Sequence, residues 1–239
     1  MATLPSLDLG LGPTPRPDLG FIYVGDPMCS WCWGFAPALE ALERRYGLQL
    51  QVVMGGLRTG PQAEVLDADA RAQLATYWQG VAERTRQPFT SASLERDGWR
   101  YDTEPSCRAV VAMRELAPDE TLRWVARLHH AFYVDGVDIT DPKQLPTLLD
   151  GFDVDPQRFA TLLVDEATAE RTRADFREAQ RYGATGFPTL LVRDGEELGI
   201  VTRGYVPWEQ LEPALTRWLE DRYGDLSASL ACDPTTAPC

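Results

Sequence analysis

The sequence predicts an α/β domain that is interrupted by a helical insertion. A βαβ pattern occupies residues 21–54, helical periodicity covers residues 67–180, and a β-hairpin followed by an amphipathic helix occupies residues 189–219. We therefore expect the two ends of the sequence to contribute to one sheet. The predicted organisation is a flexible leader (1–20), an α/β domain in two segments (21–66 and 183–226), the helical insertion (67–182) and a flexible tail (227–239).

The first unit consists of a strand, a helix and a second strand. Residues 21–25 form a short apolar run that ends at Asp26-Pro27, which is typical of a buried strand. Over residues 28–46 the apolar positions take helical spacing, and a glycine follows. Residues 48–54 then predict a second strand that ends at two glycines.

The insertion reads as helical almost throughout. Asp141-Pro142 and Asp155-Pro156 each predict a helix start, with aspartate as the N-cap and proline at the first helical position. The apolar face of the last predicted helix consists of Phe159, Leu162, Leu163 and Phe176.

Two strands and a helix follow the insertion. Residues 189–192 and 198–202 predict strands around Asp194-Gly195, a dipeptide typical of β-hairpin turns. Apolar residues at helical spacing predict a closing helix over residues 208–219, and Pro213 leaves its start open because proline fits poorly beyond the first turn.

The composition is that of a folded globular protein, with 239 residues, 44% of them hydrophobic and 25% charged. No apolar run approaches the roughly 18 residues that a membrane span needs. The net charge is −13 and basic residues are scattered among acids, so neither nucleic-acid nor membrane binding is expected. The N-terminal segment lacks the apolar stretch of a secretory signal, which predicts a cytoplasmic protein with reduced cysteines.

The pattern Cys29-Ser30-Trp31-Cys32 directly follows the first predicted strand and begins the first predicted helix. Free N–H groups and the helix dipole stabilise an anion there, so a thiolate at Cys29 would be a nucleophile at neutral pH. Cys32 lies one helical turn further on. It is spaced to attack the mixed disulfide that Cys29 forms and to release the substrate.

The other cysteines and the histidines give weaker indications. A zinc site would need two more ligands, and neither Cys232 and Cys239 nor the adjacent His129 and His130 fit the usual spacing, so no metal is expected. Cys107 is expected to be a buried small hydrophobe. The two tail cysteines leave two alternatives open: a second redox pair that relays electrons to the first, or exposed thiols.

A second pattern, Gly186-Phe187-Pro188-Thr189, enters the strand that follows the insertion. Together with the segment 26–35 (DPMCSWCWGF), it resembles the DsbA family, and most closely its cytoplasmic FrnE-like branch of protein disulfide isomerases. The resemblance runs from about Phe21 to Tyr223. It implies a thioredoxin-like fold interrupted by a helical insertion.

The resemblance also implies roles for individual residues. Cys29 would be the nucleophile, Cys32 the resolving thiol, and Pro188 a cis-proline that faces them across the fold. Substrates of the family lie along this loop, so the backbone of Phe187 would pair with an extended peptide. Trp31, which we expect to be exposed, would add an apolar contact for that peptide.

No bound cofactor is expected. The expected partners are proteins or peptides with thiols or disulfides, and a reducing partner such as glutathione or a thioredoxin system. The DsbA that oxidises secreted proteins has a histidine between its cysteines, whereas this chain has Ser30-Trp31, so reduction or isomerisation is favoured over strong oxidation.

Two other functions stay open. Kappa-class transferases and 2-hydroxychromene-2-carboxylate isomerases share the fold, have a serine where Cys29 stands, and activate bound glutathione. A non-catalytic module could instead bind unfolded chains through its aromatic residues.

Residues next to the cysteine pattern have simpler interpretations. Asp26 could accept a proton from Cys32, but a turn made with Pro27 is the favoured interpretation. Trp33 and Phe35 are expected in the core. His129 and His130 are adjacent on a predicted helix and are expected to point to different faces.

Overall fold

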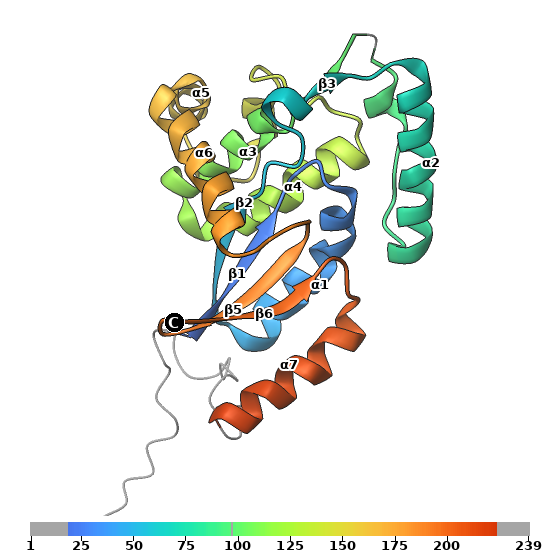
Figure 1. Cartoon of the computed structure of the whole chain (residues 1–239). Helices are drawn as coiled ribbons and strands as arrows, with labels where there is room; N and C mark the ends of the chain where they lie inside the picture. The colour runs from blue at the N-terminus through green and yellow to red at the C-terminus, as the bar shows by residue number, and fades with distance from the viewer. Residues whose placement is uncertain (1–18, 97, 224–239) are drawn as a thin grey trace, which may run out of the picture.

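The computed structural model describes residues 19–96 and 98–223 and contains a four-stranded sheet of order β2-β1-β5-β6. β1 pairs parallel with β2 and antiparallel with β5, and β5 pairs antiparallel with β6. The two ends of the sequence therefore meet in one sheet, as predicted (Figure 1). The strands are β1 (Leu19–Gly25), β2 (Gln49–Met54), β5 (Thr189–Asp194) and β6 (Glu197–Arg203).

Some predictions fall at or beyond the limits of this description. β1 begins at Leu19, two residues inside the predicted leader. The rest of that leader and the predicted tail, with Cys232 and Cys239, lie outside the described residues.

Helices cover both faces of the sheet because β1 is apolar on both sides. Phe21 and Tyr23 pack in the main core with α1 (Ser30–Tyr46) and α7 (Trp208–Tyr223). Ile22 and Val24 pack on the other face with Ala179 of α6 (Glu166–Arg181). All four β1 side chains are buried, which is the environment that a continuous apolar run predicts.

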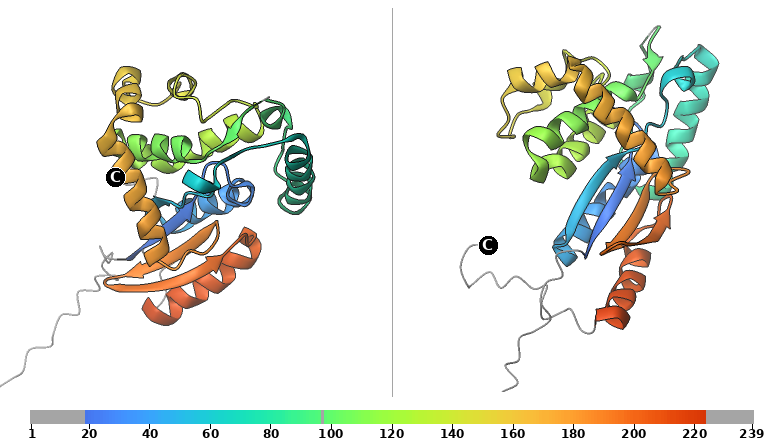
Figure 2. Two further views of the ribbon diagram at one scale, coloured as in Figure 1. Left: turned by 45° about the horizontal axis from the view of Figure 1, so that its top comes forward. Right: turned by 60° about the vertical axis from the view of Figure 1, so that its left-hand side comes forward.

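The insertion forms a group of helices beyond one end of the sheet, with α2 set to one side (Figure 2). Two very short strands, which the sequence did not predict, pair with each other beside α2. Between β2 and β5 the elements are β3 (Glu64–Val65), which precedes the predicted start of the insertion, α2 (Ala68–Thr85), β4 (Arg100–Tyr101), α3 (Glu104–Leu116), α4 (Thr121–Tyr133), α5 (Pro156–Val164) and then α6. Short 3₁₀ helices at Gly60–Gln62, Ala92–Leu94, Pro118–Glu120 and Leu145–Leu148 connect them.

Two helix predictions in the insertion are wrong. No α-helix starts at Asp141, which forms a turn by accepting the N–H of Lys143 at 2.9 Å before a 3₁₀ helix. Pro146 explains this, because it has no N–H to bond the carbonyl of Pro142, which an α-helix starting there would need. The last predicted helix is two helices: Asp165 is extended and caps α6 by accepting the N–H of Thr168 at 3.0 Å.

Other local predictions agree with the structure. Asp155 caps α5 by accepting the N–H groups of Gln157 and Arg158. The hairpin turns at Gly195, whose φ of 61° suits glycine. α7 runs from Trp208 and includes Pro213.

A partly buried ion pair fixes α3 and α6 against the sheet. Arg114 binds both carboxylate oxygens of Asp175, at 2.8 and 2.9 Å. Arg114 also donates to the carbonyl of Val52 at 2.7 Å, and Asp175 accepts the N–H of Met54 at 3.0 Å. The pair therefore satisfies backbone groups of β2 that face away from β1.

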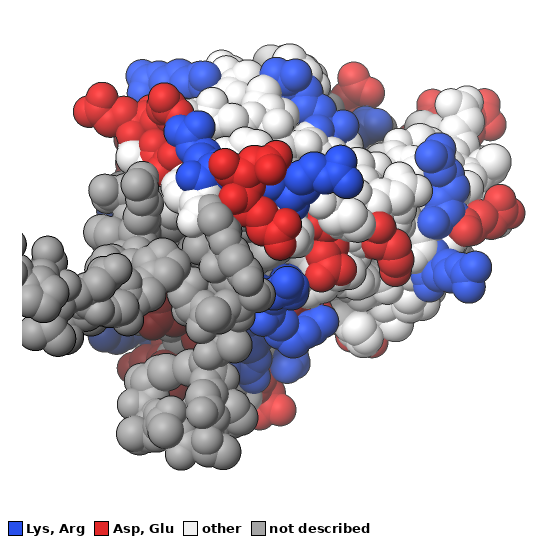
Figure 3. Space-filling view, turned by 90° about the horizontal axis from the view of Figure 1, so that it is seen from below, with Lys and Arg blue, Asp and Glu red and all other residues white. Residues whose placement is uncertain are grey.

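On the face shown in Figure 3, acidic and basic side chains are mixed over the described residues. Among residues 19–96 and 98–223, no helix is both long and apolar enough to span a bilayer.

Candidate active site

The site begins where β1 ends and α1 starts. Cys29 has an extended backbone, with φ of −90°, and is the N-cap residue of α1. Its N–H donates to the carbonyl of Asp26 at 3.1 Å. No acidic residue lies in the first turn of α1, so no carboxylate there offsets the positive potential at this end of the helix. The fold thus places the Cys29 sulfur at the positive end of a helix, as the sequence predicts.

Cys32 lies one turn into α1, on the inner side of Cys29. It is completely buried, whereas Cys29 is 5% exposed and lines a cavity. Both are free thiols. Burial raises the pKa of the Cys32 thiol well above its usual value, and the neighbouring Cys29 raises it further. The two sulfurs therefore have unequal access to a partner molecule.

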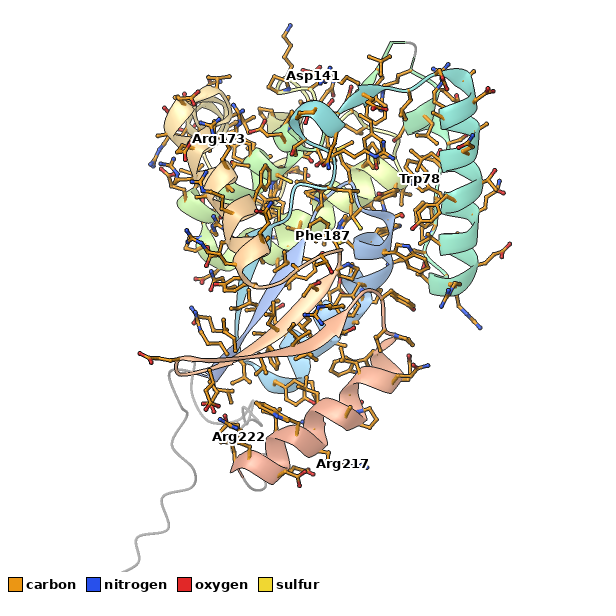
Figure 4. The ribbon with its side chains drawn as sticks, viewed as in Figure 1. Trp78, Asp141, Arg173, Phe187, Arg217 and Arg222 are labelled. Atoms are coloured by element: carbon orange, nitrogen blue, oxygen red, sulfur yellow. The ribbon has the colours of Figure 1, made fainter. Side chains whose placement is uncertain are left out.

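The loop before β5 approaches Cys29 although it lies 158 residues away in sequence. The thiol of Cys29 donates to the carbonyl oxygen of Phe187 at 3.6 Å. The Phe187–Pro188 peptide bond is cis. The ring of Phe187 lies over Gly55, where an added Cβ would be closer than 3 Å to it. Figure 4 places Phe187 where the sheet meets the insertion.

A cavity of about 640 Å³ opens beside Cys29, between the start of α1, the loop after β2, and α2. Its lining is mainly apolar and aromatic, and includes Trp31, Tyr77, Trp78, Tyr101 and Phe187. Trp78 extends into it from α2 (Figure 4). Arg58 and Glu64 are its charged residues. A cavity of this size and composition fits a small molecule or a peptide side chain.

Trp31 lines this cavity but is only partly exposed, which is less than the exposed position that the sequence predicts. Its Nε1–H donates to the Tyr77 hydroxyl at 2.5 Å. The centroid of the Trp31 ring lies 5.7 Å from that of Tyr205 and 5.4 Å from the guanidinium carbon of Arg84. The predictions for Trp33 and Phe35 are correct, since both are buried.

Asp26 forms the turn that leads to Cys29, in agreement with the favoured interpretation. Its Oδ1 accepts the N–H of Met28 at 2.8 Å. Its Oδ2 accepts the N–H of Leu57 and the hydroxyl of Thr103, both at 2.7 Å. Burial raises the pKa of this carboxyl, although the hydrogen bonds oppose the shift. Asp26 therefore joins three chain segments behind the cysteines.

Thr103 and Cys107 are contacts of Asp26 that sequence reasoning missed. Cys107 is buried, as expected, but its thiol also donates to Asp26 Oδ2 at 3.4 Å. Both residues lie more than 70 residues from Asp26 in sequence, so no local pattern could have revealed these contacts.

The two histidines do point to different surroundings. His129 is buried, and its Nε2 lies 3.3 Å from the carbonyl oxygen of Asp26. Burial lowers the pKa of His129 to about 4. His130 is exposed and contacts Asp135. No group of three or more potential metal ligands occurs among the described residues.

A dithiol at a helix start, facing a loop with a cis-proline, defines a thioredoxin-fold protein of the thiol oxidoreductase type. A model of the DsbA-like thioredoxin domain matches residues 22–216, and this chain belongs to that family. The resemblance to the DsbA family and the thioredoxin-like fold with a helical insertion are thus confirmed.

Two solved structures illustrate the likeness. The "putative protein disulfide isomerase" from Nitrosomonas europaea is 35% identical, with a TM-score of 0.76 over 85% of this chain and 98% of that one. The cytosolic disulfide reductase DsbM from Pseudomonas aeruginosa is 27% identical, with a TM-score of 0.70 over 84% of this chain and 98% of that one.

Two curated relatives are named as adapter proteins rather than as oxidoreductases. The ClpXP adapter protein SpxH from Halalkalibacterium halodurans is 23% identical over 77% of this chain. Its counterpart from Bacillus licheniformis is 22% identical over 82% of this chain. The matches span only 62% and 65% of the length of these two relatives.

Proposed function

We propose that this protein is a thiol–disulfide oxidoreductase that uses Cys29 and Cys32 on protein or peptide substrates. The observation that supports it most directly is the position of Cys29, which lies at the N-terminus of α1, beside a cavity and against the Phe187 carbonyl. A binding protein without catalysis would not need a helix-capping thiol with a second thiol directly behind it.

The proposed reaction reduces a substrate disulfide in two exchanges. The Cys29 thiolate attacks one substrate sulfur, forming a mixed disulfide and releasing the other substrate sulfur as a thiolate that takes up a proton. Cys32 then loses its proton, attacks the Cys29 sulfur and releases the second substrate thiol. Two electrons pass to the substrate, and a Cys29–Cys32 disulfide remains. An isomerase cycle would return the substrate before this second step.

The buried state of Cys32 is consistent with this order. Its raised pKa keeps Cys32 protonated while Cys29 attacks, so the two thiols do not compete for the substrate. We further propose that Phe187 pairs with the extended substrate and that Trp31 and Pro188 flank it.

We propose glutathione or a thioredoxin system as the electron donor, and a cytoplasmic location. DsbM, a cytosolic disulfide reductase, has also been solved with glutathione, and this chain is 26% identical to that structure over 84% of its length. Two glutathione molecules would supply the two electrons, leaving oxidised glutathione and the reduced dithiol.

The first test is equilibration in glutathione buffers of graded potential, followed by acid trapping and mass-spectrometric mapping of every thiol. We expect an internal Cys29–Cys32 disulfide that titrates at one potential. A protein that remains glutathionylated at Cys29 would instead support the glutathione-dependent transferase or isomerase alternative.

Insulin reduction provides the matched variant test. Cys29→Ser should reduce turnover to background, while Cys107→Ser, which removes another buried thiol and keeps a donor for Asp26, should retain it. Full activity of Cys29→Ser would contradict the proposal. Suppression of aggregation that survives loss of both motif cysteines, without reductase activity, would point to the binding-module alternative.

A further inference from the structure

We propose that Arg58 makes the cavity beside Cys29 selective for thiols and disulfides with a carboxylate close to the reacting sulfur. This inference rests on the proposed oxidoreductase function and concerns the class of substrate that the site accepts. Such a carboxylate can belong to an acidic residue in a peptide or to a small thiol such as glutathione.

The backbone of Arg58 has a fixed position relative to Cys29. Its N–H donates to the Thr103 hydroxyl at 3.2 Å, and its carbonyl accepts the N–H of Thr103 at 2.8 Å. The preceding N–H, of Leu57, donates to Asp26, which begins the turn to Cys29. The backbone around Arg58 is therefore hydrogen-bonded, directly through Leu57 and through Thr103, to the buried Asp26 that begins the turn to Cys29.

The side chain of Arg58 is placed over an aromatic ring rather than against an acid. Its guanidinium carbon lies 5.0 Å from the centroid of Tyr101, whose hydroxyl donates to the carbonyl of Met28 at 2.7 Å. No ion pair of Arg58 occurs within the part of the chain that the structure describes. Because the ring supports the guanidinium through its face, the N–H donors stay free for a planar anion, which they bind in pairs.

The surroundings make this single cation important. The protein has a formal net charge of −13, which repels anions at long range. Arg58 is the one cation among the described residues that line the cavity, and Glu64 is the one carboxylate. A substrate with one carboxylate near its sulfur gains at Arg58, whereas a second negative charge near Glu64 would be repelled.

The test measures second-order rate constants for oxidation of the reduced protein, followed by tryptophan fluorescence. One substrate pair is a short peptide disulfide with Asp or Asn next to the cysteine. The other pair is oxidised glutathione and its ethyl ester. We expect the wild-type protein to react about tenfold faster with the anionic member of at least one pair, the size of one charge-assisted contact.

Two variants separate a local contact from net charge. Arg58→Gln should bring the anionic-to-neutral rate ratio close to one. Arg217→Gln removes the same charge from the exposed face of α7, far from Phe187 (Figure 4), and should keep the wild-type ratio. A ratio is used because general damage to the fold changes both rates together.

The outcomes distinguish the possible failures. If Arg58→Gln abolishes the anionic-to-neutral rate ratio only for the glutathione pair, the site is selective for small thiols. If it abolishes the ratio for the peptide pair, the site is selective for acidic protein segments. A wild-type ratio near one for both pairs, or one that Arg58→Gln leaves unchanged, overturns the inference but not the proposed function. If no substrate oxidises the Cys29–Cys32 pair, the proposed function itself fails.

Discussion

The parts of the insertion on the two sides of the site are attached to the rest of the molecule in different ways. α3 and α6 are fixed by buried and partly buried polar contacts, through Arg114 and Asp175 at β2 and through Thr103 at Asp26. α2 buries only Trp78 and Val81 of its 18 residues. Within its own span, α2 contacts Trp31 of α1 through the exposed hydrogen bond that Tyr77, a residue that is 51% exposed, accepts, and through the guanidinium of Arg84. Directly after α2, Gln87 and Pro88 add two partly buried hydrogen bonds to Trp33.

This difference indicates how the cavity can hold one set of groups rigidly and still accept varied substrates. Buried polar contacts are expensive to break because each opening leaves unsatisfied groups, whereas exposed ones exchange with water at little cost. We therefore expect the side that holds Asp26 and Arg58 to be fixed, and the side formed by α2 to adjust. Four predictions test this comparison.

The largest expected effect is on the fixed side. Arg114→Met should lower the free energy of unfolding by about 3–5 kcal/mol, because it leaves the buried Asp175 carboxylate without its cation. Urea denaturation measures this change. The control is Arg171→Met, which breaks an exposed ion pair with Glu115 between the same two helices and should cost less than about 1 kcal/mol. Equal losses in both variants would contradict the assignment.

Acid should also weaken the fixed side through His129. Burial lowers its pKa to about 4 in the folded protein, against 6.5 for a solvated histidine, so between these pH values the unfolded chain binds a proton that the folded protein does not. This contribution is complete above pH 6.5 and falls by about 3 kcal/mol as the pH decreases to 4. Urea unfolding at several pH values measures it. His129→Gln should flatten the pH dependence, while His130→Gln should not.

A smaller loss is expected at the contact with Asp26. Thr103→Val removes the donor to Asp26 Oδ2 and the acceptor for Arg58, and should cost about 2 kcal/mol. Thr76→Val, which removes an exposed hydrogen bond within α2, should stay within about 0.5 kcal/mol. Comparable denaturation midpoints for the two variants would show that the contact with Asp26 is no stronger than an exposed one.

The smallest change in stability is expected on the α2 side. Tyr77→Phe removes the partner of Trp31 and should cost less than about 1 kcal/mol, because both groups can bind water instead. Amide hydrogen exchange should nevertheless become faster in α2 and stay unchanged in α6. Slow exchange in α2 of both the wild-type protein and the variant would mean that α2 is as firmly held as α6.

Features that depend on neighbouring residues could be predicted from the sequence. The buried run at 21–24, the Asp155 cap, the hairpin at Gly195 and the helix start at the cysteine pattern each follow from a few adjacent residues. Errors occurred where a second local feature intervened, as with Pro146 after Asp141 and Asp165 between α5 and α6.

Contacts that depend on the packing of distant segments could not be predicted. Asp26 suggests a turn, but its bonds to Leu57 and Thr103 exist only once β2 and α3 are in place. The sequence predicts an exposed Trp31 because nothing near it in sequence indicates that Tyr77 and Tyr205 will lie beside it. The roles of Cys29 and Cys32 follow from their position at a helix start, the role of Pro188 follows from the family resemblance, and all three stay predictions until the variants are measured.

The contact between Phe187 and Gly55 has a consequence for how this site can evolve. Any side chain at position 55 would occupy the space of the Phe187 ring, so the two positions cannot change independently. Among homologues that retain an aromatic residue before the loop proline, position 55 should be glycine. Glycine at position 55 should be lost only in lineages where a small residue has replaced the aromatic one at position 187. In those lineages the change at position 187 should precede the change at position 55.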